Sequence, residues 1–441
     1  MYSNFYRRYV AAVLLLVYIF NQLDRGVFNI LMEPIRQQFS LTDTQLGFVV
    51  GPALVVLYSC LGVPVARWAD HSSRVKIMTV AIALWSVITV LTATVNEFWQ
   101  LALVRIGVGV GEAGFSAIAI SVIGDYETDQ NRARALATFM LAIPISNLLS
   151  DLFGGWVNQL YGWRWVFIIA GLPGILFTVL MRTTVREPAR RPAAEPTDPS
   201  RPPLRVVLST LWRRRSLRHL MIAQGLANLV ANVIGWVYVF FVRQHHMSTG
   251  ALGSWFAVAD AVMFGGVWLS GFLSAKFGTK DPGMNTQLMG WGAVPVAPLA
   301  LFMLWCPSKE WALFGYVVLN VPMYLFLGPT QALVQNLVGP SMRATMASIF
   351  ILVQMLAGGV LGTQVVGLLS DALTPLAGNA TEALRWSMAL GSMLTLWTAA
   401  QFWMATKYVR QDLAAAPVVA TTVDSIEVIE TQVGSGVPSG G

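Results

Sequence analysis

Long apolar runs recur from one end of the chain to the other. Twelve can be counted, and each is long enough to cross a bilayer as an α-helix, which needs roughly 20 residues. The first six occupy residues 10–31, 46–68, 75–95, 98–124, 133–159 and 164–183. The second six occupy residues 218–242, 250–276, 286–306, 311–337, 344–371 and 383–407. This pattern predicts an all-α, multi-pass membrane protein.

A polar stretch divides these runs into two sets of six. Residues 1–185 are predicted to form an N-terminal six-helix bundle and residues 217–408 a C-terminal one. Between them, residues 186–216 form a cytoplasmic linker rich in proline and arginine, and repeated prolines oppose helix formation. Its distal part, 205–218, alternates basic and apolar residues, which predicts an amphipathic helix on the membrane surface or else a charge cluster that sets topology. Residues 409–441 are predicted to be a disordered cytoplasmic tail.

Composition and charge agree with a membrane protein. Of the residues, 55% are hydrophobic and only 12% are charged, against about 25% charged in soluble proteins. The net charge is +7, and the basic residues gather in alternate loops, as the positive-inside rule expects of cytoplasmic loops. This distribution predicts a location in the cell's inner (plasma) membrane with both termini cytoplasmic. It indicates the lipid bilayer, and not a nucleic acid, as the partner.

Ionisable residues interrupt two of the apolar runs. Asp24 and Arg25, with Asn21 one turn earlier, lie in the first run, and Arg105 and Glu112 lie in the fourth. A charge at membrane depth costs at least about 2.5 kcal/mol on insertion scales, so these residues are expected to line a protein-enclosed pathway. Arg105 and Glu112 are seven positions apart and therefore share a helix face. All four charged residues are candidates for proton coupling, and Asn21 and Arg25 also for substrate binding.

The fifth run contains an unexpected acid, Asp151. It lies beside small residues at four-residue spacing, Ser146, Ser150 and Gly154, and such a stripe lets a neighbouring helix approach closely. Two interpretations of Asp151 stay open. It is either an additional titratable group in the pathway or a polar residue that changes helix packing.

The seventh run carries a polar stripe. Asn228, Asn232 and Trp236 follow one another at four-residue spacing and share one helix face. Tyr324 in the tenth run is a further candidate. Hydrogen bonding between helices explains such a face as well as substrate contact does, because amides bridge membrane helices. These four residues are tentative substrate-binding residues.

Two motifs resemble known families. The loop from Gly62 to Lys76 contains Asp70 and Arg74 and resembles the signature loop between spans two and three of the major facilitator superfamily. That resemblance implies a fold of 12 transmembrane helices in two six-helix pseudo-repeat bundles, with Asp70 and Arg74 in a gating loop. Arg105 and the spaced glycines after it resemble a second superfamily motif, associated with proton-coupled members.

A finer resemblance rests on the first and fourth runs. Asn21, Asp24 and Arg25 in the first run, with Gly111-Glu112-Ala113 in the fourth, resemble the spinster branch of the superfamily, in its bacterial type. The resemblance implies transport of lysophospholipids or sphingosine phosphate, with Asp24 and Glu112 as the protonation pair and Arg25 beside them.

These observations together predict a function. We expect a proton-coupled secondary active transporter that moves amphipathic lipid-like substrates by alternating access, as a monomer. The alternative is a proton-coupled carrier of a small polar solute, such as an organic or sugar acid or a drug. The chain has no His-Glu-x-x-His, phosphate-loop or Gly-x-Ser-x-Gly motif, so an enzyme is not expected. No cofactor or metal site is predicted; protons would be the coupling ion.

Overall fold

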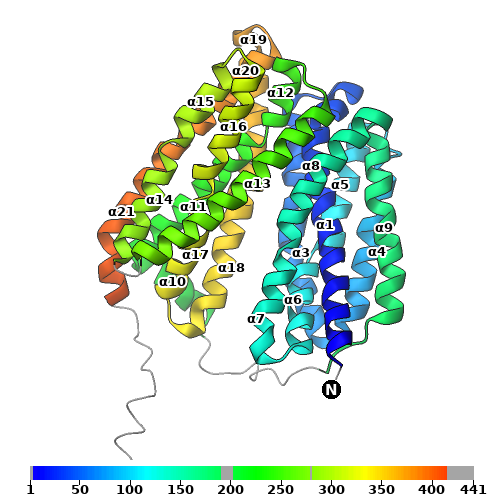
Figure 1. Ribbon diagram of the computed structural model, residues 1–441, viewed down its shortest axis with the longest axis vertical. Helices are drawn as coiled ribbons and strands as arrows, with labels where there is room; N and C mark the ends of the chain where they lie inside the picture. The colour runs from blue at the N-terminus through cyan, green and yellow to red at the C-terminus, as the bar shows by residue number, and fades with distance from the viewer. Residues whose placement is uncertain (1–2, 190–201, 279–280, 415–441) are drawn as a thin grey trace, which may run out of the picture.

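The computed structural model describes residues 3–189, 202–278 and 281–414, and nearly all of them are helical. They form two bundles that lie side by side (Figure 1). The first bundle consists of α1 (Asn4–Phe39), α2 (Asp43–Val50), α3 (Pro52–His71), α4 (Arg74–Thr92), α5 (Phe98–Glu112), α6 (Phe115–Tyr126), α7 (Asp129–Met140), α8 (Ala142–Tyr161) and α9 (Trp163–Thr184). The second bundle consists of α10 (Leu204–Arg213), α11 (Arg215–Ile234), α12 (Val237–His245), α13 (Thr249–Leu273), η1 (Ser274–Gly278), α14 (Pro282–Ala293), α15 (Val296–Trp305), α16 (Lys309–Met323), α17 (Leu327–Asn336), η2 (Pro340–Met342), α18 (Arg343–Gln354), η3 (Met355–Gly362), α19 (Thr363–Ala377), α20 (Ala380–Ser392) and α21 (Leu394–Ala414).

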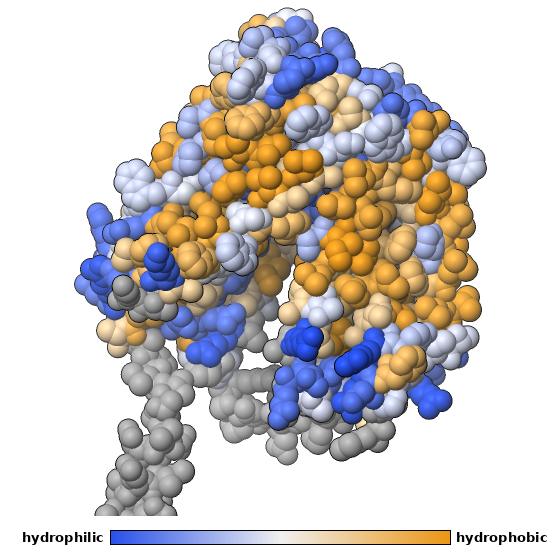
Figure 2. All heavy atoms as spheres, viewed as in Figure 1, coloured by the Kyte–Doolittle hydropathy of each residue, from blue (hydrophilic) through white to orange (hydrophobic). Residues whose placement is uncertain are grey.

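The helices are suited to a membrane. Within the described residues, 11 helical segments are long and apolar enough to cross one, several of them built from two consecutive helices. The pair α20 and α21 completes the second bundle, and the polar residues Gln401 and Lys407 lower the hydropathy of α21. Figure 2 shows hydrophobic residues across the middle of both bundles and hydrophilic ones at their upper and lower ends. The predicted all-α fold with two six-helix bundles is confirmed.

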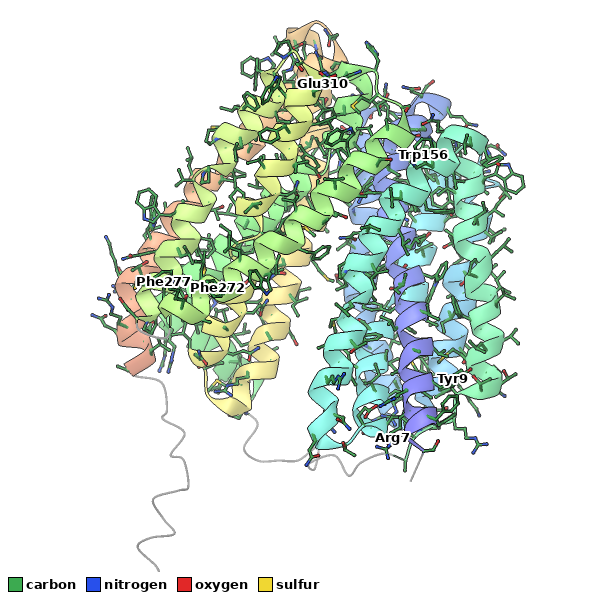
Figure 3. All side chains as sticks on the ribbon, viewed as in Figure 1. Arg7, Tyr9, Trp156, Phe272, Phe277 and Glu310 are labelled. Atoms are coloured by element: carbon green, nitrogen blue, oxygen red, sulfur yellow. The ribbon has the colours of Figure 1, made fainter. Side chains whose placement is uncertain are left out.

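The two bundles touch at one end and separate at the other. They meet at the upper end in Figure 1, while an opening separates their lower ends, where the N-terminus lies. At the closed end α8 packs against α13, and α2 packs against α19. Trp156 lies at the first of these contacts (Figure 3), and its indole Nε1 donates a hydrogen bond of 3.0 Å to the Ser254 hydroxyl.

Glycine makes the closed end possible. A Cβ atom at Gly253 of α13 would lie 2.0 Å from the carbonyl oxygen of Asp151, and one at Gly155 of α8 would lie 2.4 Å from the carbonyl oxygen of Thr249. Only a residue without a side chain permits such backbone contact. The small-residue stripe predicted in the fifth run therefore continues as a contact between the bundles.

The helix after the linker and the last helix of the chain refine the predicted domain boundaries. In α10, Val207 and Leu211 are buried against the second bundle, whereas Leu204 and Trp212 are exposed. The proline-rich residues 190–201, and residues 415–441 of the predicted disordered tail 409–441, lie outside the described residues. The prediction of disorder is wrong for residues 409–414: α21 continues to Ala414, and Val409 is buried against the second bundle.

We predict that Gly253→Val opens the closed end. The added side chain overlaps the Asp151 backbone, so α8 and α13 have to separate. Spin labels at the exposed positions Glu97 and Lys309, one on each bundle, should show a longer distance by double electron–electron resonance in a cysteine-free background.

The matched control is Gly265→Val on the same helix. A Cβ atom there meets nothing within 4 Å, so the label distance should stay at its wild-type value. An unchanged distance in Gly253→Val would show that this glycine does not hold the bundles together.

Candidate functional site

A break in the fourth span positions one buried acid. Glu112 is the last residue of α5, and Gly114, with φ +79°, starts α6 in a new direction. The left-handed conformation at Gly114 is unfavourable for residues with a side chain. Glu112 thereby faces the middle of α1, where Asp24 and Arg25 lie.

Four charged side chains of α1 and α5 form a cross-paired cluster, which we call the charge quartet. The Arg25 Nε donates a hydrogen bond of 2.5 Å to Glu112 Oε2. The Arg105 Nη1 lies 3.8 Å from Asp24 Oδ2, a looser ion pair. Asp24, Arg105 and Glu112 are only 3%, 2% and 1% exposed. The sequence analysis predicted that these residues share a pathway, and the structure brings all four together.

Aromatic rings complete the surroundings of both guanidinium groups. The Arg25 guanidinium lies 4.3 Å from the centre of the Tyr58 ring, and that of Arg105 lies 4.3 Å from the centre of the Phe28 ring. Contacts of this kind stabilise a cation away from water. Neither ring was among the predicted site residues, because Phe28 and Tyr58 look like ordinary apolar positions in the sequence.

The quartet retains unused hydrogen-bonding capacity. Within the described part of the chain, Asp24 Oδ2, Glu112 Oε1, Arg25 Nη2 and Arg105 Nε are buried and have no hydrogen-bond partner. Leaving charged atoms unpaired in the interior is costly. The quartet is neutral when all four groups are ionised, and one added proton makes it positive. It can therefore respond to a proton or to a charged ligand.

Two cavities lie between the bundles. The central cavity has a volume of about 260 Å³ and is lined by residues of both bundles, including Asn29, Asp151, Asn228, Asn232, Trp236, Tyr238, Asp260, Tyr316 and Tyr324. The side cavity also measures about 260 Å³ and is lined by Arg25, Leu54, Val55, Tyr58, Asn228, Asn232, Ile351, Gln354, Met355 and Gly359. Asn228 and Asn232 line both cavities, so the two adjoin.

Five of the six predicted substrate-binding residues line one or both cavities, and one lines neither. Asn228, Asn232, Trp236 and Tyr324 line the central cavity, and Arg25 lines the side cavity. Asn21 is buried and is not among the lining residues of either cavity within the described chain. Its burial follows from the face of α1 on which it lies, which a single sequence does not specify.

The asparagines of α11 do not bridge helices through their amide N–H groups. Asn228 Nδ2 donates to the carbonyl oxygen of Gln224, and Asn232 Nδ2 donates to that of Asn228, each at 3.0 Å and within α11. Both asparagines line the cavities, and their contact with a substrate stays a prediction.

Asp151 has a partner that the sequence analysis missed. The Tyr238 hydroxyl donates a hydrogen bond of 2.7 Å to Asp151 Oδ1, from the opposite bundle. Asp151 and Asp260 both line the central cavity. Asp260 was visible in the sequence as a rare intramembrane acid of the second half, but nothing in the sequence indicated that α13 brings it to Asp151.

The closed end contains a second buried charge cluster, which we call the end lock. Arg243 of α12 donates to Glu33 Oε2 of α1 at 2.8 Å and to both carboxylate oxygens of Asp43 of α2 at 2.9 and 2.6 Å. Ser370 of α19 also donates to Asp43, at 2.6 Å. The lock thus joins the two bundles. Sequence analysis missed it because each residue lies near the end of an apolar run, where a charge is unremarkable.

Arg74, which was predicted to lie in a gating loop, is the first residue of α4 and pairs with more distant parts of the first bundle. Its guanidinium donates to Asp125 Oδ2 of α6 at 2.5 Å and to Glu187 Oε1, after α9, at 3.0 Å. Ser73 caps α4 by accepting a hydrogen bond from the Lys76 N–H. Asp70 lies in α3, one residue before its end at His71, and not in a loop as predicted. The start of α4, which follows directly, is tied to α6 and to the segment after α9 at the open end.

Two bundles around a polar cavity, with buried charges beside it, define a membrane transport protein. A model of the Major Facilitator Superfamily matches residues 14–363, and the chain belongs to this superfamily. It is 29% identical over 416 residues to an MFS-type efflux pump of Mycolicibacterium smegmatis, covering 91% of this chain and 93% of that protein. It is 24% identical over 405 residues to the sphingosine-1-phosphate transporter SPNS2 of Danio rerio, covering 86% of this chain and 78% of that protein.

A solved structure shows the same arrangement. A bacterial homologue of the human lysosomal transporter spinster, crystallised in an inward-facing and unoccupied conformation, matches with a TM-score of 0.86 and 27% identity. The match covers 93% of this chain and 99% of that one. These comparisons confirm the predicted resemblance to the superfamily and to spinster-type transporters, and they agree with the expectation that the protein is not an enzyme.

We predict that Glu187→Gln weakens the open-end loop in a pH-dependent way. Burial opposes ionisation of Glu187, but hydrogen bonds from the Val75 N–H, Ser73 and Arg74 outweigh it and lower the pKa of Glu187. A lowered pKa means stabilisation that is full above the ordinary value of about 4.3 and is lost as the pH falls through the native value. The midpoint of thermal unfolding should drop at pH 7, and its decline toward pH 3 should become shallower.

The control for this measurement is Glu97→Gln, an exposed carboxylate at the opposite end. Its unfolding midpoint should follow the wild-type pH profile. An acid profile of Glu187→Gln equal to that of the wild type would remove the assigned role of Glu187.

Proposed function

We propose that the protein is a proton-coupled secondary transporter of amphipathic, lipid-like substrates that works by alternating access. The observation that carries this proposal is Arg25. It is the member of the charge quartet that lines a cavity, and it hydrogen-bonds the buried Glu112 at the same time. We further propose an inner-membrane location with both termini cytoplasmic, so that the open end faces the cytoplasm.

Proton binding and substrate binding are coupled because the Arg25 guanidinium can pair either with Glu112 or with an anionic group of the substrate. When a proton adds to Glu112, the carboxylate loses its negative charge and its ion pair with Arg25 weakens. The Arg25 guanidinium is then available to an anionic group in the side cavity, which it can bind through two parallel N–H bonds. Release of the proton restores the ion pair with Glu112 and displaces the anion. Asp24 and Arg105 provide a second, looser pair that can exchange a proton next to the first.

Alternating access requires that the end lock opens. In the present conformation Arg243 is held by Glu33 and Asp43, and the opposite end is open. Separating a buried ion pair without compensation costs about 3–5 kcal/mol. Contacts that form as the open end closes, together with water entering the lock, have to offset this cost. Rocking of one bundle against the other would close the open end and admit water to the end lock in the same movement.

The side cavity supports a lipid-like substrate. Leu54, Val55, Ile351 and Met355 offer an apolar surface beside the Arg25 guanidinium, which suits a molecule with an apolar tail and an anionic headgroup. The relative that transports sphingosine-1-phosphate points to the same substrate class. The central cavity, lined by asparagine, aspartate and tyrosine, favours a second candidate, a small polar solute or drug.

We predict that Asp24→Asn and Glu112→Gln remove the pH response of transport. Either change eliminates one proton-binding carboxylate of the quartet while preserving its shape. Uptake of fluorescent lysophosphatidylcholine into proteoliposomes should depend on an imposed pH gradient in the wild type and lose that dependence in the variants. Asp281→Asn, at a partly exposed carboxylate that lies outside the quartet and pairs with Arg410, should behave as the wild type. Wild-type pH dependence in both quartet variants would exclude proton coupling through this site.

We predict that Arg25→Lys and Arg25→Gln separate two roles of this residue. Lysine keeps the positive charge near Glu112 but cannot bind an anion through a planar pair of N–H groups. Apparent substrate affinity should fall about tenfold in Arg25→Lys while the pH response persists. Arg25→Gln should lose both. Equal affinity of Arg25→Lys and the wild type would show that the guanidinium does not bind the substrate.

A further inference from the structure

The central cavity contains negative charge without a positive partner. Asp151 comes from α8 and Asp260 from α13, and no lysine, arginine or histidine is among the described residues that line the cavity. The negative charge of the Asp260 carboxylate acts on the Asp151 carboxyl group, so the two groups repel each other when both are ionised. Asp260 makes no hydrogen bond with the described part of the chain. Two neighbouring carboxylates away from bulk water are costly unless a cation or a proton neutralises them.

Aromatic side chains surround the acid pair. Tyr238, Tyr316, Tyr324 and Trp236 line the same cavity. Tyr238 is fixed in place by its hydrogen bond to Asp151 and by an edge-to-face contact with Phe256. Tyrosine and tryptophan faces attract ammonium groups through cation–π interactions. The combination of carboxylates and rings is therefore suited to an organic cation.

Trp236 is an independent sign of a ligand. Its side chain lines the cavity and is 1% exposed, yet its indole Nε1 has no hydrogen-bond partner within the described residues. A buried indole N–H normally finds an acceptor. An oxygen atom on a molecule in the cavity would provide one.

A bare metal ion fits the cavity poorly. No group of three or more acidic, histidine or cysteine side chains in the described residues could hold a metal ion. The cavity volume of about 260 Å³ is also large against the ~30 Å³ that one water molecule occupies in the liquid. The lining and the volume both favour a polyatomic cation.

We propose that the central cavity binds the ammonium group of an amphipathic amine. Asp151 and Asp260 neutralise its charge, the tyrosine rings contact its N-alkyl or N–H groups, and Trp236 donates to an oxygen nearby. The apolar remainder of the molecule extends past Asn228 and Asn232 into the side cavity. The inference deepens the proposed function by naming a substrate class, and it rests on that function only for transport, since the binding site itself is independent of proton coupling.

The test uses two amphiphiles with the same tail and opposite charge. Full-length protein in phosphatidylcholine nanodiscs is titrated with radiolabelled dodecyltrimethylammonium and with dodecyl sulfate, both below their micelle concentrations, with empty nanodiscs subtracted. At alkaline pH, where ionised Glu112 holds Arg25, the wild type should bind the cation saturably and more tightly than the anion. Asp260→Asn and Asp151→Asn should each weaken binding of the cation about tenfold or more, and the double variant should abolish the preference for positive charge.

Three controls keep the outcome decisive. Asp281→Asn removes a partly exposed carboxylate that is not among the residues lining the cavity and should bind the cation as the wild type does. Asp260→Asn removes no protein hydrogen bond, so its thermal unfolding midpoint should match the wild type and exclude misfolding. Tyr238→Phe keeps both carboxylates and should retain the preference for the cation.

Two results would overturn the proposal. One is wild-type binding of dodecyl sulfate as tight as that of dodecyltrimethylammonium at alkaline pH, where ionised Glu112 holds Arg25 and the anion site proposed for the side cavity is closed. The other is unchanged cation binding in a folded Asp260→Asn variant. Either result leaves proton coupling by Asp24 and Glu112 untouched, because that coupling is measured by the pH response of transport. Conversely, loss of proton coupling would leave the charge preference of the central cavity intact.

Discussion

Charge inside a membrane has to be neutralised by the protein itself, and this constraint shapes the molecule more than any other. Water is absent from the hydrocarbon region, so a buried carboxylate or guanidinium needs a partner of opposite charge, a proton or a ligand. Three clusters of the structure meet this requirement in three different ways. Their differences assign a task to each region between the two bundles.

The end lock is the most completely satisfied of the three clusters. Arg243 holds two carboxylates, and Asp43 also accepts from Ser370. The charge quartet is balanced in charge but leaves one polar atom of each member without a partner. The acid pair Asp151 and Asp260 has no cation among the residues that line its cavity. The end lock, whose charges are paired, stabilises one conformation. The charge quartet, whose hydrogen bonds are incomplete, can respond to protons. The acid pair, whose negative charge is not balanced by the residues around it, is suited to a cationic ligand.

Sequence patterns were sufficient for the fold because hydrophobic length and loop charge are local properties. They were also sufficient for the quartet, since an acid such as Asp24 or Glu112 within an apolar run is conspicuous. They could not show that Arg25 pairs with Glu112 while Arg105 pairs with Asp24, because the pairing depends on the break at Gly114. The end lock stayed hidden for another reason: Arg243 joins the bundles only through a tertiary contact, and a charge near the end of a span is ordinarily solvated.

Closure and cavity chemistry are connected through one backbone contact. Gly253 of α13 touches the carbonyl group of Asp151 on α8, and Asp260 follows seven positions later on α13, two turns along the same helix. The helices that bring the two carboxyl groups into one cavity are therefore the helices that seal the closed end. If the bundles part there, Asp151 and Asp260 move apart with them. The hydrogen bond from Tyr238 to Asp151 then breaks unless the Tyr238 side chain changes its conformation. The negative cavity is thus assembled by the conformation in which the opposite end is open, which is a geometric condition for accepting a molecule from one side and releasing it to the other.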